Sequence, residues 1–184
     1  MKKVLIIHGL SGTPNGGWRP WLMAELEKKD IYACALAMPS PDEPAVYEWL
    51  DEIERHVTAQ DDVYLIGHSL GATAILRYLE NPKSCPISGA ILVSGPFHPT
   101  ANKKVENFLN KPFNFDAIKK KCPLFAIIHG DNDTVVPLED GKQFADQLEC
   151  SLMIVKNGQH LNGSAGWVQL PDCLRALQKM IIKS

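Results

Sequence analysis

The chain has 184 residues, of which 45% are hydrophobic and 22% are charged, and its formal net charge is −2. A chain of this length can bury a substantial core without metals or disulfides, so we expect one domain spanning residues 1–184. The nearly neutral charge argues against a general nucleic-acid binder or a protein of anionic membranes, because both need a clear basic excess.

Short apolar runs alternate with amphipathic segments along the chain. In chain order the apolar runs predict strands at Lys3–Ile7, Ile31–Ala35, Val63–Ile66, Ser88–Val93, Leu124–Ile128 and Ser151–Val155. Helical spacing between them predicts helices at Trp18–Lys28, Ala45–Val57, Leu70–Leu79, Leu138–Leu148 and Trp167–Ile182. Several strands are apolar at nearly every position, which is typical of a sheet covered on both faces. The order predicts a doubly wound α/β fold, with a mostly parallel sheet of about six strands and helices on both faces.

The segment Gly95–Cys122 is less regular and contains three prolines. We expect two short helices in it, near Lys103–Leu109 and Phe115–Lys121. The stretch between Val93 and Leu124 is too short for a large lid domain, which favours a shallow, open site.

Cysteine usage and the N-terminus bear on the cellular compartment. The five cysteines are scattered and include no C-x-x-C pair, so they indicate reduced thiols rather than a disulfide framework or a zinc site. The opening "MKKVLIIHG" reads as a first strand rather than a signal peptide, because its apolar run is short and lacks a cleavage site. No stretch approaches the roughly 18 apolar residues of a membrane span. We therefore expect a cytoplasmic protein that does not enter membranes.

Polar candidates follow the predicted strands at the point where each strand ends. His8 and Gly9 follow the first strand and Ser69 the third, while Asp131 and Asp133 follow the fifth and His160 the sixth. Ligands of open parallel sheets bind beyond the carboxyl ends of the strands. These side chains are thus expected to meet at one edge.

The loop from Gly9 to Gly17 is rich in glycine and lies between a strand and a helix. A dinucleotide fingerprint needs G-x-G-x-x-G, and a phosphate-binding P-loop needs G-x-x-x-x-G-K-[ST]. The loop has neither spacing, and Trp18 stands where the lysine should be. Nucleotide binding remains an alternative that this spacing does not favour.

The segment "GHSLG", Gly67 to Gly71, places a serine between an apolar strand and a helix. This is the G-x-S-x-G pattern of a nucleophile held on a sharp turn, with glycines that let strand and helix pass closely. Ser69 is the predicted nucleophile. The N–H of Leu70 and an N–H from the loop after the first strand, assigned to Leu10, are the expected oxyanion-hole donors, with Gly9 allowing close approach.

A serine nucleophile needs a histidine base and a carboxylate, in the chain order Ser, Asp or Glu, His. His160 lies in the loop after the last strand and is the candidate base. Asp133 is the candidate acid, and Asp131, two residues before it, is the alternative. The aspartate that is not the acid would then serve only as a turn former, a common role for aspartate where a strand ends.

The segment "HGDNDTVVP" resembles the H-G-x-x-D-x-x-V-P acid-loop signature of α/β-hydrolase esterases, whose catalytic acid matches Asp133. "GHSLG" resembles the nucleophile elbow of that family, and "GQH" resembles the loop that carries its base. More narrowly, "VLIIHGLSG", "GGWRPWLMAEL" and "EWLDEI" resemble the small, lidless serine hydrolases related to retinoblastoma-binding protein nine. This resemblance implies a trimmed α/β-hydrolase fold, a Ser–Asp–His triad and hydrolysis of small esters, amides or thioesters.

The remaining expectations concern substrate and partners. Trp18 and Trp167 are candidates for bordering the acyl pocket, although buried tryptophans more often serve packing. No metal-ligand spacing and no cofactor motif is present, so we expect neither metal nor cofactor. The expected ligand is a small ester or a peptide-like molecule, and nothing in the sequence indicates a protein partner. A binding or scaffold protein that keeps the hydrolase fold but has lost turnover is the alternative from another class.

Overall fold

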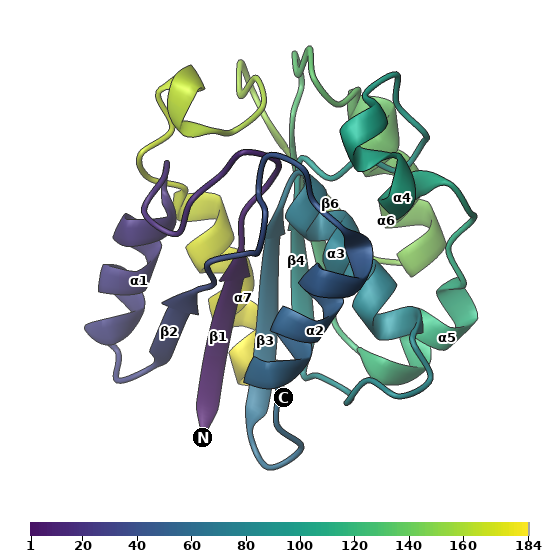
Figure 1. The fold of residues 1–184 in the computed structure, drawn as a ribbon. Helices are drawn as coiled ribbons and strands as arrows, with labels where there is room; N and C mark the ends of the chain where they lie inside the picture. The colour runs from purple at the N-terminus through teal and green to yellow at the C-terminus, as the bar shows by residue number, and fades with distance from the viewer. Residues whose placement is uncertain (184) are drawn as a thin grey trace.

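A computed structural model describes residues 1–183, and its centre is a six-stranded sheet (Figure 1). The strands are β1 (Lys2–Ile7), β2 (Tyr32–Ala35), β3 (Asp62–His68), β4 (Gly89–Val93), β5 (Phe125–Gly130) and β6 (Ser151–Val155). Their order across the sheet is β2-β1-β3-β4-β5-β6, and all neighbouring pairs are parallel. This confirms the predicted doubly wound α/β architecture, because the chain builds outward in one direction to β2 and in the other to β6.

Helices cover both faces of the sheet. One face carries α1 (Arg19–Glu27) and α7 (Pro171–Lys183). The other carries α2 (Val46–His56), α3 (Leu70–Glu80), α4 (Glu106–Leu109), α5 (Phe115–Lys121) and α6 (Leu138–Leu148). Two single 3₁₀ turns, η1 (Lys103–Val105) and η2 (Gly163–Ala165), lie in the connecting segments.

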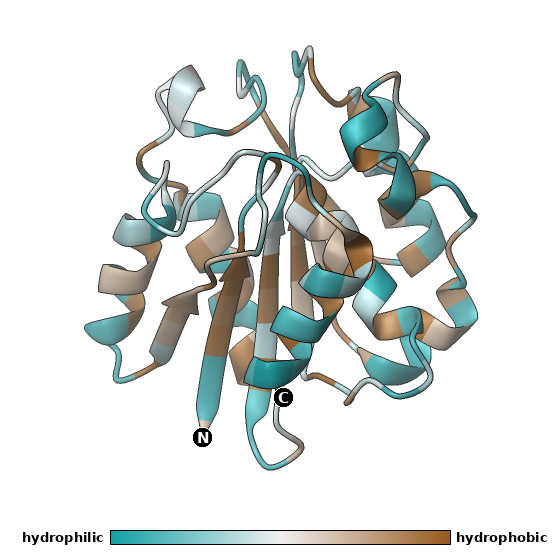
Figure 2. Ribbon diagram, in the orientation of Figure 1, coloured by the Kyte–Doolittle hydropathy of each residue, from teal (hydrophilic) through white to brown (hydrophobic). Residues whose placement is uncertain are grey.

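The strands are apolar at nearly every position because both of their faces are buried. In β1, Leu5 and Ile7 pack into the core beneath α2 and α3, whereas Val4 and Ile6 pack into the core beneath α1 and α7. This alternation is the two-residue period of a strand. Figure 2 shows the result as hydrophobic strands enclosed by helices that carry hydrophilic residues.

The structure differs from the sequence expectation at the start of the last helix. We expected this helix to begin at Trp167, but α7 begins at Pro171. A proline suits the first helical position because its missing N–H has no helical partner there. The preceding residues belong to the loop instead, with the Trp167 N–H donating to the Asn162 carbonyl oxygen at 3.1 Å.

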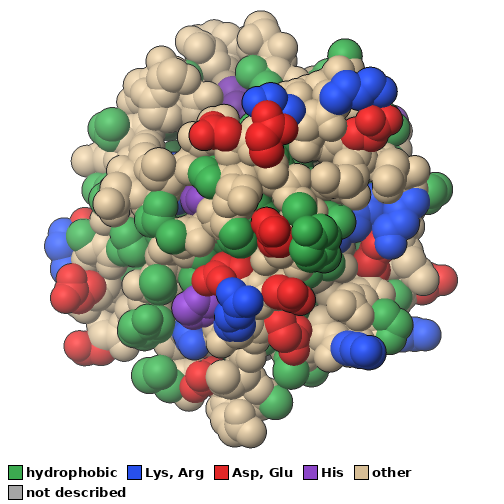
Figure 3. Space-filling view, in the orientation of Figure 1, with side chains coloured by type: hydrophobic (Ala, Val, Ile, Leu, Met, Phe, Trp, Pro, Cys, Tyr) green, Lys and Arg blue, Asp and Glu red, His purple; other side chains and the backbone are tan. Residues whose placement is uncertain are grey.

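The surface shows no field of a single charge sign on the face in Figure 3, where acidic and basic side chains are interspersed. Along residues 1–183, no helix combines the length and the apolar character needed to cross a membrane. All five cysteines are free thiols.

Candidate active site

Ser69 lies at the sharp junction between β3 and α3. Its backbone adopts φ 54° and ψ −120°, a conformation that costs a non-glycine residue about 1–3 kcal/mol. The turn is tied to the neighbouring strand by the Ser69 N–H, which donates to the Val93 carbonyl oxygen at 2.8 Å. The side chain is thereby placed at the N-terminus of α3, at the carboxyl edge of the sheet.

The two glycines around Ser69 are required by the close approach of strand and helix. A Cβ atom on Gly71 would lie 2.3 Å from the Ile7 carbonyl oxygen, and one on Gly67 would lie 2.4 Å from the Ala72 nitrogen. Both clashes are with backbone, which cannot move aside as a flexible side chain could. The spacing of the G-x-S-x-G pattern is therefore explained by packing at this junction.

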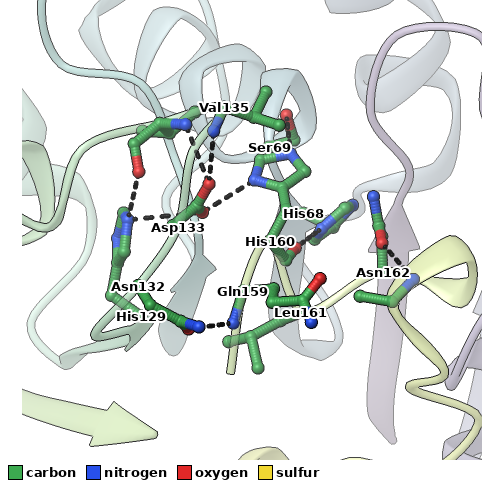
Figure 4. A network of polar contacts seen from close by, with 12 residues as sticks. His68, Ser69, His129, Asn132, Asp133, Val135, Gln159, His160, Leu161 and Asn162 are labelled. Atoms are coloured by element: carbon green, nitrogen blue, oxygen red, sulfur yellow. Dashed lines mark hydrogen bonds and ion pairs between the residues drawn. The ribbon is translucent and has the colours of Figure 1, made fainter. Parts of the chain in front are cut away.

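The side chains of Ser69, His160 and Asp133 form a continuous chain of polar contacts (Figure 4). His160 Nε2 lies 3.0 Å from Ser69 Oγ, and His160 Nδ1 lies 2.8 Å from Asp133 Oδ2. The carboxylate fixes the imidazole with its proton on Nδ1, so that Nε2 is free to accept a proton from the serine hydroxyl. The structure thus brings together the three residues that the sequence nominated.

Asp133 is shielded from solvent and well supplied with donors. Its Oδ1 accepts hydrogen bonds from the N–H groups of Val135 at 2.8 Å and Val136 at 2.9 Å. Burial raises the pKa of this carboxyl, but the hydrogen bonds from His160 and from the two backbone N–H groups outweigh burial and leave its pKa below the usual value. Asp133 is therefore an anion at neutral pH.

Asp131 and Asn132 accept hydrogen bonds from the loop that carries His160. Asn132 was not identified for this role from the sequence. Asp131 is exposed, and its Oδ1 accepts from the Asn157 N–H at 2.7 Å. Asn132 Oδ1 accepts from the Gln159 N–H at 2.7 Å. Together these two side chains hold the loop that presents His160. The position of Asn132 in a polar turn after a strand was the available signal in the sequence. Its hydrogen-bond partner, Gln159, could not be inferred because it lies in a loop that is distant in the chain.

His68, which precedes Ser69 in the chain, holds the same loop from the other side. Its Nε2 donates to the His160 carbonyl oxygen at 2.9 Å. Burial, with smaller contributions from the neighbouring His160 and Arg19, lowers the pKa of His68 to about 3, so the imidazole is neutral. Of the two adjacent residues at this turn, His68 therefore contacts the backbone of His160 and Ser69 contacts its side chain.

The two tryptophans nominated for the substrate pocket lie elsewhere. Trp18 is fully buried, packs edge-on against His68 and donates from Nε1 to the Leu161 carbonyl oxygen at 2.9 Å. Trp167 is half-buried against the core on the α1–α7 face. Neither lines the cavities beside Ser69. Their large apolar surfaces serve packing behind the His160 loop, which corrects the expectation that they border the substrate.

The loop after β1 lies directly against Ser69. A Cβ atom on Gly9 would lie 2.9 Å from Ser69 Cβ, so only glycine permits this approach. His8 shapes the loop, because its Nδ1 donates to the Gly9 carbonyl oxygen at 2.8 Å while its Nε2 accepts from the Met38 N–H at 3.3 Å. Burial lowers the pKa of His8, which keeps it in this neutral tautomer.

Two backbone donors beside Ser69 lack partners. Within the part of the chain that the structure describes, the N–H groups of Leu10 and Leu70 donate to no acceptor. Leu70 is the first residue of α3, where an unpaired N–H and the positive end of the helix dipole coincide. Both residues line the cavity over Ser69.

Two cavities flank Ser69 and His160. The larger has a volume of about 290 Å³ and a mainly apolar wall that includes Leu70, Val105 and Val136. The smaller has a volume of about 190 Å³ and a polar wall that includes Arg19 and Asn162. Among residues 1–183, no group of three or more His, Cys, Asp or Glu side chains could hold a metal ion. The chemistry available here is that of a serine, an imidazole, a carboxylate and backbone donors.

Comparison with known proteins agrees with this arrangement. The family described as serine hydrolase matches residues 4–179. The chain is 34% identical to the YdeN protein of Bacillus subtilis (strain 168) over 174 residues, which covers 92% of this chain and 91% of that protein. It is 25% identical to serine hydrolase RBBP9 of Rattus norvegicus over 184 residues, covering 97% and 95% of the two chains.

The fold of YdeN is also shared. Its crystal structure superposes with a TM-score of 0.92 at 31% sequence identity, over 98% of this chain and 99% of that one. The match therefore extends from the first strand to the last helix. The chain belongs to the serine hydrolase family, with the small α/β-hydrolase fold of YdeN and RBBP9.

Proposed function

We propose that the protein hydrolyses small carboxylic esters through a covalent acyl-enzyme. Ser69 Oγ attacks the ester carbonyl carbon while His160 Nε2 takes its proton, and His160 then returns that proton to the departing alcohol. Water, activated by His160, next hydrolyses the acyl-serine. The observation that carries the proposal is the contact of His160 with Ser69 at 3.0 Å and with Asp133 at 2.8 Å.

Asp133 orients His160 and stabilises the imidazolium that forms during each proton transfer. Its lowered pKa supports this role, because the carboxylate remains charged at neutral pH. The hydrogen bonds from the N–H groups of Val135 and Val136 hold the carboxylate toward the imidazole.

The N–H groups of Leu10 and Leu70 would stabilise the oxyanion of the tetrahedral intermediates. Each donor of this kind typically contributes about 3 kcal/mol to transition-state stabilisation. Both are without an acceptor in the described part of the chain, so neither must break a hydrogen bond to act. The packing of Gly9 against Ser69 brings the first loop close enough for this pairing.

The cavities favour small substrates. Their volumes of about 190 and 290 Å³ are at or below the lower end of ordinary ligand pockets. The segment after β4 contributes Pro96, Thr100 and Val105 to one wall but forms no large lid. Short esters and peptide-like acyl groups fit this site, and amides or thioesters could react by the same route. Turnover of long triglycerides without turnover of short esters would contradict this assignment of substrate size.

A fluorophosphonate probe tests the assembled site directly, because it reacts with a serine that is activated by a base and an oxyanion hole. We expect intact mass to show a single adduct on the wild-type protein and none on Ser69→Ala. Ser11→Ala is the matched control: Ser11 also has a positive φ of 53° and lies in the loop after β1, but it is exposed, and its hydroxyl forms no hydrogen bond within the described residues. This control should label like the wild type.

A folded wild-type protein that forms no adduct would contradict the proposal. It would favour the alternative of a binding or scaffold protein that retains the hydrolase fold. An adduct that persists in Ser69→Ala would show that another residue is the nucleophile.

A further inference from the structure

Arg19 is a buried cation without an acidic partner. It is the first residue of α1 and only 6% exposed. Its Nε donates to the Thr13 carbonyl oxygen at 3.0 Å, and within the described residues its terminal nitrogens form no ion pair or other hydrogen bond. Buried charges are normally paired, because removing an ion from water is costly. The missing counter-ion therefore needs an explanation.

Among the described residues, no acidic side chain forms an ion pair with Arg19. Burial lowers its pKa to about 10, which still leaves the guanidinium charged at neutral pH. The titratable groups that interact with it electrostatically include His8 and His68, which burial keeps neutral. The nearest catalytic carboxylate, Asp133, uses both of its oxygens on His160 and on backbone N–H groups.

Arg19 lines the same small cavity as Ser69 and His160. Its Nη2 lies against the backbone of the preceding loop, since a Cβ atom on Gly16 would lie 2.5 Å from it. The cavity of about 190 Å³ has room for a group of a few non-hydrogen atoms. The second cavity that Ser69 lines has a mainly apolar wall and no arginine. The two cavities beside Ser69 thus differ in charge.

We propose that Arg19 binds a carboxylate of the substrate, so that the preferred substrates are short esters with a carboxylate a few bonds from the scissile carbonyl. A planar guanidinium matches the two oxygens of a carboxylate, and the ligand would supply the missing counter-ion. The apolar cavity then receives the uncharged half of the ester. This inference rests on the proposed esterase function and specifies its substrate class.

The test uses two pairs of esters that differ only in charge. Acetoxyacetate against acetoxyacetamide places the carboxylate on the alcohol side, and monoethyl glutarate against its monoamide places it on the acyl side. In at least one pair, kcat/KM of the wild type should favour the carboxylate over the amide by about 10- to 100-fold, the range expected for a charged hydrogen bond. Arg19→Gln should bring that ratio to about one, and Arg19→Lys should leave an intermediate ratio because it keeps the charge but not the fork.

Arg175→Gln is the matched control. Arg175 is an exposed arginine on α7 that pairs with Asp172, so its loss should leave the ratio at the wild-type value. A purely structural role of Arg19 would change the rates for carboxylate and amide alike and leave their ratio untouched, which would overturn the proposal. So would a wild-type enzyme that shows no preference in either pair.

Binding to Ser69→Ala separates this inference from the proposed function, because it needs no turnover. Calorimetry should show about 10- to 100-fold tighter binding of the carboxylate than of the amide for the favoured pair, and the difference should vanish in Ser69→Ala with Arg19→Gln. Such binding without hydrolysis or probe labelling would contradict the esterase function alone. Equal binding of carboxylate and amide by a protein that does label and hydrolyse would contradict the role of Arg19 alone. If Arg19→Gln does not fold, the wild-type ratio and the Ser69→Ala affinities decide.

Discussion

His68 Nε2 donates a hydrogen bond to the carbonyl oxygen of His160 across 2.9 Å. The residue beside Ser69, the proposed nucleophile, therefore holds the backbone of the residue proposed as its base. His160 also reaches Ser69 through its side chain at 3.0 Å. The loop after β6 is thus fastened to the elbow at two points, and small displacements of either would change the geometry of proton transfer.

Loss of the His68 contact should lower kcat more than it changes KM. We expect His68→Ala to reduce kcat for short esters by about 10- to 100-fold, because a shift of the base by about 1 Å has effects of this size. His68→Gln should recover much of the loss, since its amide can donate to the same carbonyl oxygen. Steady-state kinetics of both variants measure this, and equal kcat for all three proteins would show that the contact does not position His160.

The two neighbouring aspartates provide a matched pair. Asp133→Asn should lower kcat on the order of 10³- to 10⁴-fold, because an amide at this position favours the wrong imidazole tautomer. Asp131→Asn should stay within a few-fold of wild type, since the asparagine oxygen can still accept from the Asn157 N–H. A larger loss in Asp131→Asn than in Asp133→Asn would reverse the assignment of the acid.

The burial of His68 predicts a dependence of stability on pH. Its pKa is lowered from 6.5 to about 3, so between these values the unfolded chain takes up a proton that the folded protein does not. The free energy of unfolding should therefore fall as pH decreases from about 6.5 toward 3, by up to about 1.4 kcal/mol per pH unit from this residue.

Urea unfolding of wild type and His68→Gln at a series of pH values isolates this contribution. The stability of the variant relative to wild type should increase as the solution is acidified. A difference that is constant from pH 7 to pH 4 would mean that His68 is protonated in the folded protein.

Gly71 is expected to tolerate no side chain. Gly71→Ala would place Cβ 2.3 Å from the Ile7 carbonyl oxygen and should destabilise the protein by roughly 3 kcal/mol or more, or prevent folding. Gly166→Ala is the control: Gly166 has a positive φ of 84°, but no atom lies within 4 Å of the added Cβ. Its cost should be near 1 kcal/mol, the penalty for an alanine in a left-handed conformation. Thermal unfolding compares the two, and similar losses would show that small shifts of the surrounding backbone relieve the clash at Gly71.

The sequence by itself determined the fold class and the nominated residues. Apolar runs such as "VLII" and "AILV" are typical of strands buried on both faces, and their alternation with amphipathic segments favours parallel crossovers. Parallel strands bring all their carboxyl ends to one edge, so Ser69, Asp133 and His160 had to approach one another. The last helix begins at Pro171 rather than at Trp167, because the residues before the proline are hydrogen-bonded within their own loop.

Only the tertiary structure decided how that edge is arranged. Asp131 and Asp133 occupy one turn, and which of them contacts His160 depends on a loop that follows in the chain only after α6 and β6. Trp18 and Arg19 are adjacent in sequence, yet one packs behind His68 and the other lines the cavity beside Ser69. Residue type and periodicity set which segments pack together, but the position of a side chain in a loop is set by contacts with distant segments.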